Sequence, residues 1–213
     1  MISLLLAATT SATAAAIPGG GVLPSPNELE APHRFRSGVA LGFSLGAGLV
    51  GASGYPNDSS KIGEQSYYSA SGWMLGTAQS LFVMGALSDY ISVGFWYAHA
   101  TAANGDWRSN GNGGGLRVEV FPFAGIQRFA GLGLLGQFGL GGGSLSAKQP
   151  GYPEATGTQS FVLAGVFHEW SSGHVLGGHF AIGPSLEYGA IWSQSFERHG
   201  LTANARLVFY GGP

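Results

Sequence analysis

HRFRSGVALGFSLGAGLVGAS, residues 33–53, is the stretch that decides the fold. Between Phe35 and Leu49 the odd-numbered residues are mostly phenylalanine, valine and leucine, whereas the even-numbered residues are mostly glycine. Successive side chains of a β-strand point to opposite faces, and a helix would mix these two classes around its circumference. The alternation continues far beyond the ~5–6 residues of an average strand. It predicts one long strand with an apolar face and a face of small residues.

The composition agrees with a sheet that faces lipid. Of 213 residues, 45% are hydrophobic and only 9% are charged, and 38 are glycine. Soluble domains average about 25% charged residues. No stretch after residue 16 approaches the ~18 consecutive apolar residues of a membrane helix. Such a chain enters a bilayer by closing a β-barrel, in which every backbone N–H and C=O group is paired.

Charge and cysteine content exclude several classes of partner and site. The net charge is −2, and no basic patch is present to bind phosphate groups, which argues against a nucleic-acid partner. The chain has no cysteine, so disulfides and thiolate metal sites are excluded.

The N-terminal residues resemble an export signal followed by a linker. Residues 1–16, MISLLLAATTSATAAA, have an apolar core and then small residues with A-x-A cleavage sites, which predicts a signal peptide. A short buried strand or a disordered leader is the alternative. Residues 17–32 are rich in proline and glycine without a period and predict a flexible periplasmic lead-in. The barrel is expected over residues 33–210.

Eight strands follow from the alternating segments and the links between them. The links after the second, fourth and sixth strands are short, whereas 54–66, 103–114 and 147–158 are long and polar. Short turns at one end and long loops at the other are typical of outer-membrane barrels. The expected strands are 34–52, 67–86, 91–102, 116–121, 129–146, 159–170, 174–192 and 200–210.

The eight strands, the loop asymmetry and the aromatic residues near the C-terminus resemble the small outer-membrane barrels of the OmpA/OmpX and opacity-protein type. The resemblance covers residues 33–210 and implies a single all-β, eight-stranded, antiparallel up-and-down transmembrane barrel. It further implies a monomer in the bacterial outer membrane, in contact with outer-membrane lipid and lipopolysaccharide. The barrel-insertion machinery would read a terminal aromatic, here Phe209 or Tyr210, although residues 211–213 follow.

Seven aromatic residues are expected to form belts at the two membrane interfaces, where aromatic rings are enriched. The alternative is a set of aromatics in a soluble core. The seven are Trp73, Phe95, Tyr97, Phe129, Tyr188, Trp192 and Phe209.

Four charged residues fall on the inward parity of their strands: Arg117, Glu119, Glu187 and Arg206. An eight-stranded barrel is only wide enough to be filled by side chains, and a lone buried charge is very costly. We therefore expect a lumen ion-pair cluster. This cluster and the small inward residues are expected to plug the lumen as a structural feature, and a gated pore is the alternative.

Catalytic and metal sites are not expected. The segment from His199 to Asn204 faintly resembles the His-x-Ser-Asn arrangement of lipid A deacylase barrels, but Leu201 occupies the position of the serine. His168 and Glu169 are adjacent and would face opposite sides of a strand. His174 and His179 do not complete a set of metal ligands, so no metal or cofactor is expected. Because the serine of the deacylase arrangement is missing, the chain is not expected to be an enzyme.

The function predicted from the sequence is structural or surface-interacting, with the loops 54–66, 103–114, 147–158 and 193–199 as the contact surface. A narrow channel for small solutes or apolar molecules is the first alternative, and a lipid-modifying barrel enzyme is the second. A third alternative is a soluble, secreted barrel that binds a ligand in its lumen. That barrel would need the opposite parity, with the apolar face inside.

Overall fold

The computed structural model describes residues 36, 38–175 and 177–211, and the side chains of these residues except 172–175. The predicted signal peptide (1–16) and lead-in (17–32) lie outside the described residues. No helix of the described part is long and apolar enough to cross a membrane. The described elements are β1 Val39–Gly54, η1 Gln65–Tyr67, β2 Ser69–Ala86, β3 Ile91–Ala103, β4 Trp107–Val120, η2 Gln127–Phe129, β5 Leu132–Ala147, β6 Ala155–His168, β7 Trp170–Val175, β8 Gly178–Trp192 and β9 Phe196–Gly211.

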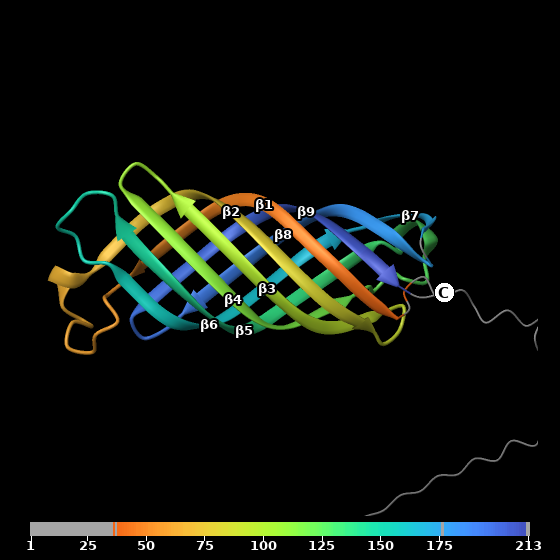
Figure 1. The fold of residues 1–213 in the computed structure, drawn as a ribbon, viewed down its shortest axis with the longest axis horizontal. Coiled ribbons are helices and arrows are strands. Elements are labelled where there is room, and N and C mark those ends of the chain that lie inside the picture. The colour runs from red at the N-terminus through yellow and green to blue at the C-terminus, as the bar shows by residue number, and fades with distance from the viewer. Residues whose placement is uncertain (1–35, 37, 176, 212–213) are drawn as a thin grey trace, which may run out of the picture. The chain divides into compact units, whose positions relative to one another are not determined.

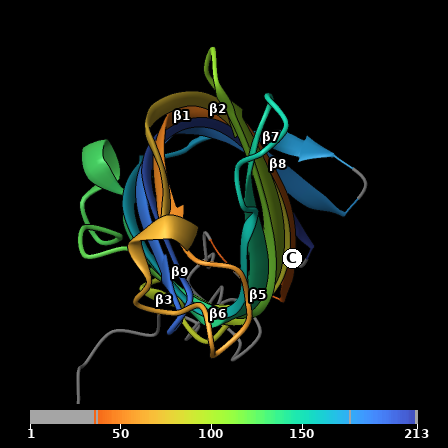
Figure 2. The same ribbon diagram turned by 90° about the vertical axis from the view of Figure 1, so that its left-hand side faces the viewer.

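The strands form one antiparallel sheet that closes on itself (Figures 1 and 2). Strands β1 to β6 follow one another around the wall, β1 also pairs with β9, and β9 pairs with β8. The pairing of β6 with β8 completes the ring. Strand β7 pairs with the start of β8 beyond the end of β6, so it extends the wall locally and adds no further strand to the ring. The predicted eight-stranded antiparallel barrel is confirmed.

The stagger of the strands sets the width of the barrel. The row of paired residues that starts at Phe43 on β1 crosses all eight strands and returns to β1 at Ser53, ten residues further along (53 − 43). With a rise of ~3.3 Å per residue and a strand spacing of ~4.8 Å, this stagger tilts the strands by about 40°. A barrel of eight strands at this tilt has a lumen that side chains can fill.

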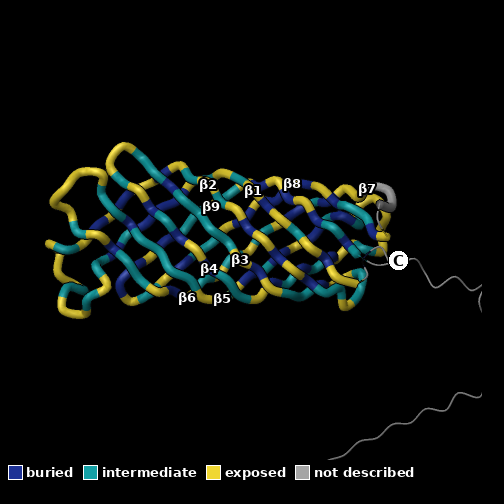
Figure 3. The backbone as a smooth tube through the Cα atoms, viewed as in Figure 1, coloured by how far each residue is buried: buried dark blue, intermediate teal, exposed yellow. Residues whose placement is uncertain are grey.

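The two faces of the wall are as the opening stretch predicts. Along β1 the side chains of Leu41 and Phe43 are 52% and 39% exposed. Ser44, between Phe43 and Leu45, points to the other face and is 4% exposed. Exposed and buried residues alternate along the strands throughout the wall (Figure 3). The apolar face therefore points outward and the small-residue face inward, opposite to the parity that the soluble ligand-binding barrel requires.

The predicted strand ends need correction in two places. The expected loop 103–114 is wrong, because β4 begins at Trp107 and only residues 104–106 form the turn. Asparagine and glycine are poor strand formers on their own, but here they pair on both sides, with Asn110 opposite Thr101 of β3 and Ser144 of β5. The expected turn at 171–173 is also wrong, because these residues belong to β7 and the chain turns between Val175 and Gly178.

The links divide between the two ends of the barrel. Residues 55–68, 104–106, 148–154 and 193–195 lie at one end, which we call the loop end (left in Figure 1). The links 87–90 and 121–131, the β7–β8 turn, Gly38 and Gly211 lie at the other, the terminal end. The expected loops 147–158 and 193–199 are thus shorter than predicted, since β6 and β9 extend into them.

Closure between β1 and β9 can be tested with a pair of cysteines, because the chain has none of its own. Ala47 and Ala203 are register partners on the outside of the wall. We expect Ala47→Cys with Ala203→Cys to form a disulfide on oxidation, detected as faster migration on a non-reducing denaturing gel.

The matched control is Ala47→Cys with Leu207→Cys. Leu207 pairs with Phe43, four residues or about 13 Å from Ala47 along the strand, which is beyond the ~7 Å that a disulfide spans. Equal cross-linking of both pairs, or of neither, would contradict the closure.

Candidate functional site in the lumen

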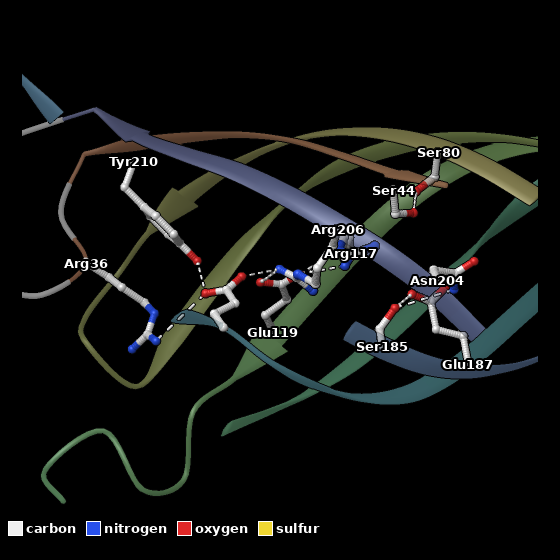
Figure 4. A network of polar contacts seen from close by, with 11 residues as sticks. Arg36, Ser44, Ser80, Arg117, Glu119, Ser185, Glu187, Asn204, Arg206 and Tyr210 are labelled. Carbon is white, nitrogen blue, oxygen red and sulfur yellow. Dashed lines mark hydrogen bonds and ion pairs between the residues drawn. The ribbon is translucent and has the colours of Figure 1, made fainter. Parts of the chain in front are cut away.

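A network of buried charges lies inside the barrel toward the terminal end (Figure 4). It consists of Arg36, Arg117, Glu119, Glu169 and Arg206, joined by Tyr210; we call this set the ion network. Its members come from the segment before β1, from β4, from the residue between β6 and β7, and from β9. Strands β4 and β9 lie four strands apart in the ring of eight, so the network crosses the lumen.

Glu119 is the point at which two arginines meet. Its Oε1 accepts a hydrogen bond from Nε of Arg117 at 2.8 Å, and Nη2 of Arg117 lies 2.6 Å from the same oxygen. Nη2 of Arg206 donates to Oε1 at 2.9 Å and to Oε2 at 3.1 Å. Charge-assisted hydrogen bonds of this kind are about twice as strong as neutral ones.

Glu169 connects the network to the terminal end of the barrel. Arg206 donates to its Oε1 at 2.7 Å, and the hydroxyl of Tyr210 donates to its Oε2 at 2.8 Å. Nη2 of Arg36 lies 3.9 Å from Oε2 and donates to the carbonyl of Ala130 at 2.9 Å. Three arginines and two glutamates therefore share one buried network with a formal charge of +1.

Aromatic rings cover the arginines of the network. The guanidinium carbon of Arg36 lies 3.4 Å from the ring centre of Phe121, and that of Arg117 lies 4.0 Å from the ring centre of Phe82. Arg206 lies 3.9 Å from the ring centre of Phe167. These contacts are cation–π interactions, which gain strength where water is excluded. The three rings are themselves buried, so they also fill the lumen at this level.

The structure brings together three of the four charged residues that the sequence singled out. Arg117, Glu119 and Arg206 meet in the ion network, each at most 2% exposed. Glu187 also faces the lumen but lies outside the network: Ser185 donates to its carboxylate at 2.7 Å, and Asn204 donates to Ser185 at 3.4 Å. A pairing of Glu187 with the network arginines is therefore wrong.

Two members of the ion network were missed at the sequence level. Glu169 follows the segment 159–168, which is apolar on both faces, so its inward direction could not be assigned from alternation. Arg36 is the last charged residue before β1 and falls on the inward parity of the opening stretch, which is the signal that could have identified it. It also holds the turn between β2 and β3, since its backbone N–H donates to Asp89 at 3.1 Å.

The seven predicted interface aromatics lie on the outside of the barrel, at different heights. Trp73 and Trp192 lie toward the loop end, and Phe129 and Phe209 toward the terminal end. The other three have aliphatic register partners: Phe95 lies beside Val83 and Leu116, Tyr97 beside Leu81, and Tyr188 beside Leu201. These three lie within the apolar wall and not at its edge. Further exposed aromatics at the terminal end are Tyr90, Phe123 and Trp170.

The segment compared with lipid A deacylases has no catalytic geometry. His199 points outward, where its ring stands edge-on to Trp73 with ring centres 5.5 Å apart, whereas Asn204 is buried on the inner face. The two side chains are on opposite sides of the wall. Among the described residues, no three His, Cys, Asp or Glu side chains are grouped so that they could hold a metal ion.

Comparison with known proteins finds likeness only among solved structures. No family model matches the chain, and no curated protein matches it. The chain is similar to Ail, the attachment invasion locus protein of Yersinia pestis, with 12% identity and a TM-score of 0.48 over 81% of this chain and 99% of that one. It is similar to Neisserial surface protein A, with 12% identity and a TM-score of 0.44 over 80% and 98% of the two chains. It is similar to the outer membrane protein OprG from Pseudomonas aeruginosa, with 10% identity and a TM-score of 0.35 over 84% and 98%.

The ion network predicts that Glu119→Gln lowers the free energy of unfolding more than Glu187→Gln does. Glu119→Gln removes the carboxylate that two buried arginines share, and leaving buried charge uncompensated costs about 3–5 kcal/mol of unfolding free energy. Glu187→Gln, the matched control, weakens a contact to one hydroxyl, and we expect a loss of about 0.5–1.5 kcal/mol. Urea unfolding of the two variants and the wild type, refolded in lipid vesicles, measures both losses. Equal losses would show that Glu119 has no special place in the lumen.

Proposed function

We propose that this protein is an integral protein of the bacterial outer membrane with a structural or surface-interaction role. The observation that carries the proposal is the apolar outer face of the barrel. Large apolar side chains are exposed on all eight strands of the ring: Leu41 on β1, Leu81 on β2, Phe95 on β3, Leu116 on β4, Leu134 on β5, Val162 on β6, Leu186 on β8 and Leu207 on β9. We call this surface the apolar belt.

The extent of the apolar belt favours lipid over a protein partner. Soluble monomers rarely expose apolar patches larger than a few hundred Å². Leu81, Phe95 and Leu186 are each about half exposed or more, at 59%, 69% and 48%. A docking site for one partner would occupy one side of the barrel, whereas this belt surrounds it. Lipid hydrocarbon covers such a surface on every side.

The outer face becomes polar toward the loop end on β3 to β6. Thr77 and Thr101 share a hydrogen bond at 3.2 Å across the outside of β2 and β3. Asn110 continues this surface on β4, and Thr158 on β6 is exposed. We therefore place the hydrocarbon around the terminal half of the wall. The loop end would project into the headgroup and sugar layer, in contact with lipopolysaccharide.

The loops at the loop end support one another and present the contact surface that we propose. Ser69 donates to the carbonyl of Pro153 at 2.9 Å, and Lys148 donates to the carbonyl of Asn104 at 2.6 Å. Within the loop 55–68, the hydroxyl and backbone N–H of Ser60 donate to Asp58 and hold its pKa below the ordinary value. Tyr68 and Tyr152 are exposed at 40% and 62%, and exposed tyrosines are common in recognition surfaces.

A narrow channel is the alternative role for the same barrel. The lumen contains a cavity of about 90 Å³ on the loop side of the ion network. Against a channel, the ion network and the rings of Phe82, Phe121 and Phe167 occupy the lumen at the terminal end, where all of them are at most 3% exposed. This arrangement favours a closed barrel. The chain would enter the membrane through the barrel-insertion machinery, with Phe209 as its outward-facing aromatic near the end of β9.

The membrane placement predicts that an arginine is tolerated at one height of the wall and not at another. Leu81 lies between Phe43 and Tyr97 in the apolar belt, so Leu81→Arg should cost about 2–4 kcal/mol of unfolding free energy in lipid vesicles. Thr158→Arg, outside the belt, should cost about 0–1 kcal/mol. A wall that faces water would tolerate both changes equally, and that result would contradict the placement.

A closed lumen predicts no ion current. Wild-type protein in planar bilayers should show no conductance steps, and Glu187→Ala should show none either, because the ion network is intact in that variant. Successful insertion is checked by the different migration of heated and unheated samples on a gel. Steps in the wild type that change with Glu187→Ala would favour the channel in place of the closed barrel.

A further inference from the structure

The cavity on the loop side of the ion network contains an arginine that the network does not use. Along β9 the inward residues after Arg206 are Asn204, Thr202, Gly200 and Arg198, which lead toward the loop end and line the cavity. Most of the remaining wall of the cavity is alanine, glycine, serine or short aliphatic side chains. These small residues leave the space open.

Arg198 is a buried cation without a counter-charge. It is 5% exposed, and among the residues that the structure describes its guanidinium has no hydrogen-bond or ion-pair partner. A Cβ added to Gly111 of β4 would overlap its Nη1, so the side chain reaches across the lumen from β9 to the opposite strand. The glycine at position 111 is what makes room for the guanidinium.

The surroundings of Arg198 prevent bulk water from solvating it on one side. Toward the loop end an apolar cluster covers it; this cluster consists of Val50, Ala52, Met74, Ala102, Leu145, Ala155 and Phe196. Toward the terminal end lies the cavity, with the amide nitrogen of Gln137 also unpartnered in its wall. An unpaired buried charge is costly, so the open side of Arg198 is where a counter-charge would bind.

Glu187 does not supply that counter-charge. It lines the same cavity, but its register partner on β9 is Thr202, four residues or about 13 Å along the strand from Arg198. Its carboxylate hydrogen-bonds to Ser185 instead. The cavity therefore has a cationic wall near the apolar cluster and an acidic wall near the ion network. Among the described residues, Arg198 is the one arginine or lysine that lines the cavity, so a single negative charge at Arg198 would balance it.

We propose that Arg198 and the cavity beside it form a binding site for a small monocarboxylate anion of about the size of acetate. The cavity of about 90 Å³ holds a few water-sized groups, which excludes sugars and nucleotides. The two oxygens of a carboxylate match the planar fork of a guanidinium. The free amide of Gln137 is a further donor in the same wall.

Saturation-transfer NMR with acetate tests the proposal on the full chain refolded in detergent micelles. Gluconate is used as the only other anion, because it is too large for the cavity. We expect the acetate methyl signal to receive saturation from the wild type, and the neutral isostere acetamide to receive far less. Arg198→Gln should weaken acetate binding at least about tenfold, since it removes a charge-assisted contact.

Arg108→Gln is the matched control, because Arg108 is an exposed arginine outside the lumen, and it should leave the acetate signal unchanged. Arg198→Lys keeps the charge without the fork and should bind acetate with intermediate affinity; it replaces Arg198→Gln if that variant does not fold, as judged by the heated and unheated gel. The proposal is overturned if folded wild type gives no acetate signal, if acetamide equals acetate, or if the folded Arg198 variant binds as the wild type does.

Discussion

The pairing of β1 with β9 is the constraint on which the rest of the structure depends. It joins the first and last strands along their length, from Val39 opposite Gly211 to Gly54 opposite Phe196. Closure satisfies the backbone groups of every strand in the ring, which is what allows a chain with 9% charged residues to expose an apolar wall. Closure with a ten-residue stagger also sets a narrow lumen, so every inward side chain has to be accommodated among the others.

Buried charges are accommodated differently in the two halves of the narrow lumen. At the terminal end, arginines and glutamates compensate one another and aromatic rings fill the remaining space. Toward the loop end, glycine and alanine leave space and Arg198 has no acidic neighbour within reach. The same physical rule, that a buried charge needs a partner, therefore yields a network of paired arginines and glutamates in one half and a candidate ligand site in the other.

Alternation predicted the direction of a side chain well and its height along the barrel poorly. The inward positions of Arg117, Glu119 and Arg206 follow from period-two patterns within single strands. The exclusion of Glu187 from their network depends on the stagger between strands, which no single segment of sequence displays. Likewise, the first half of β4 is strand because β3 and β5 pair with it, although Asn110 and its glycine neighbours have low intrinsic strand preference. Glu169 was missed because the preceding residues are apolar on both faces.

The ion network also resolves an ambiguity in how the strands can be assembled. In an alternating sequence, sliding one strand by two residues returns every side chain to the same face. Such a slip of β9 along β1 would keep leucines outside and glycines inside, so burial alone hardly distinguishes the slipped barrel from the native one. It would, however, move Arg206 by about 7 Å. Its carboxylate partners Glu119 and Glu169 belong to other parts of the wall and lie within 3 Å in the native pairing. The ion pairs thus favour the native register of β9 over the slipped register, a distinction that the hydrophobic pattern by itself does not provide.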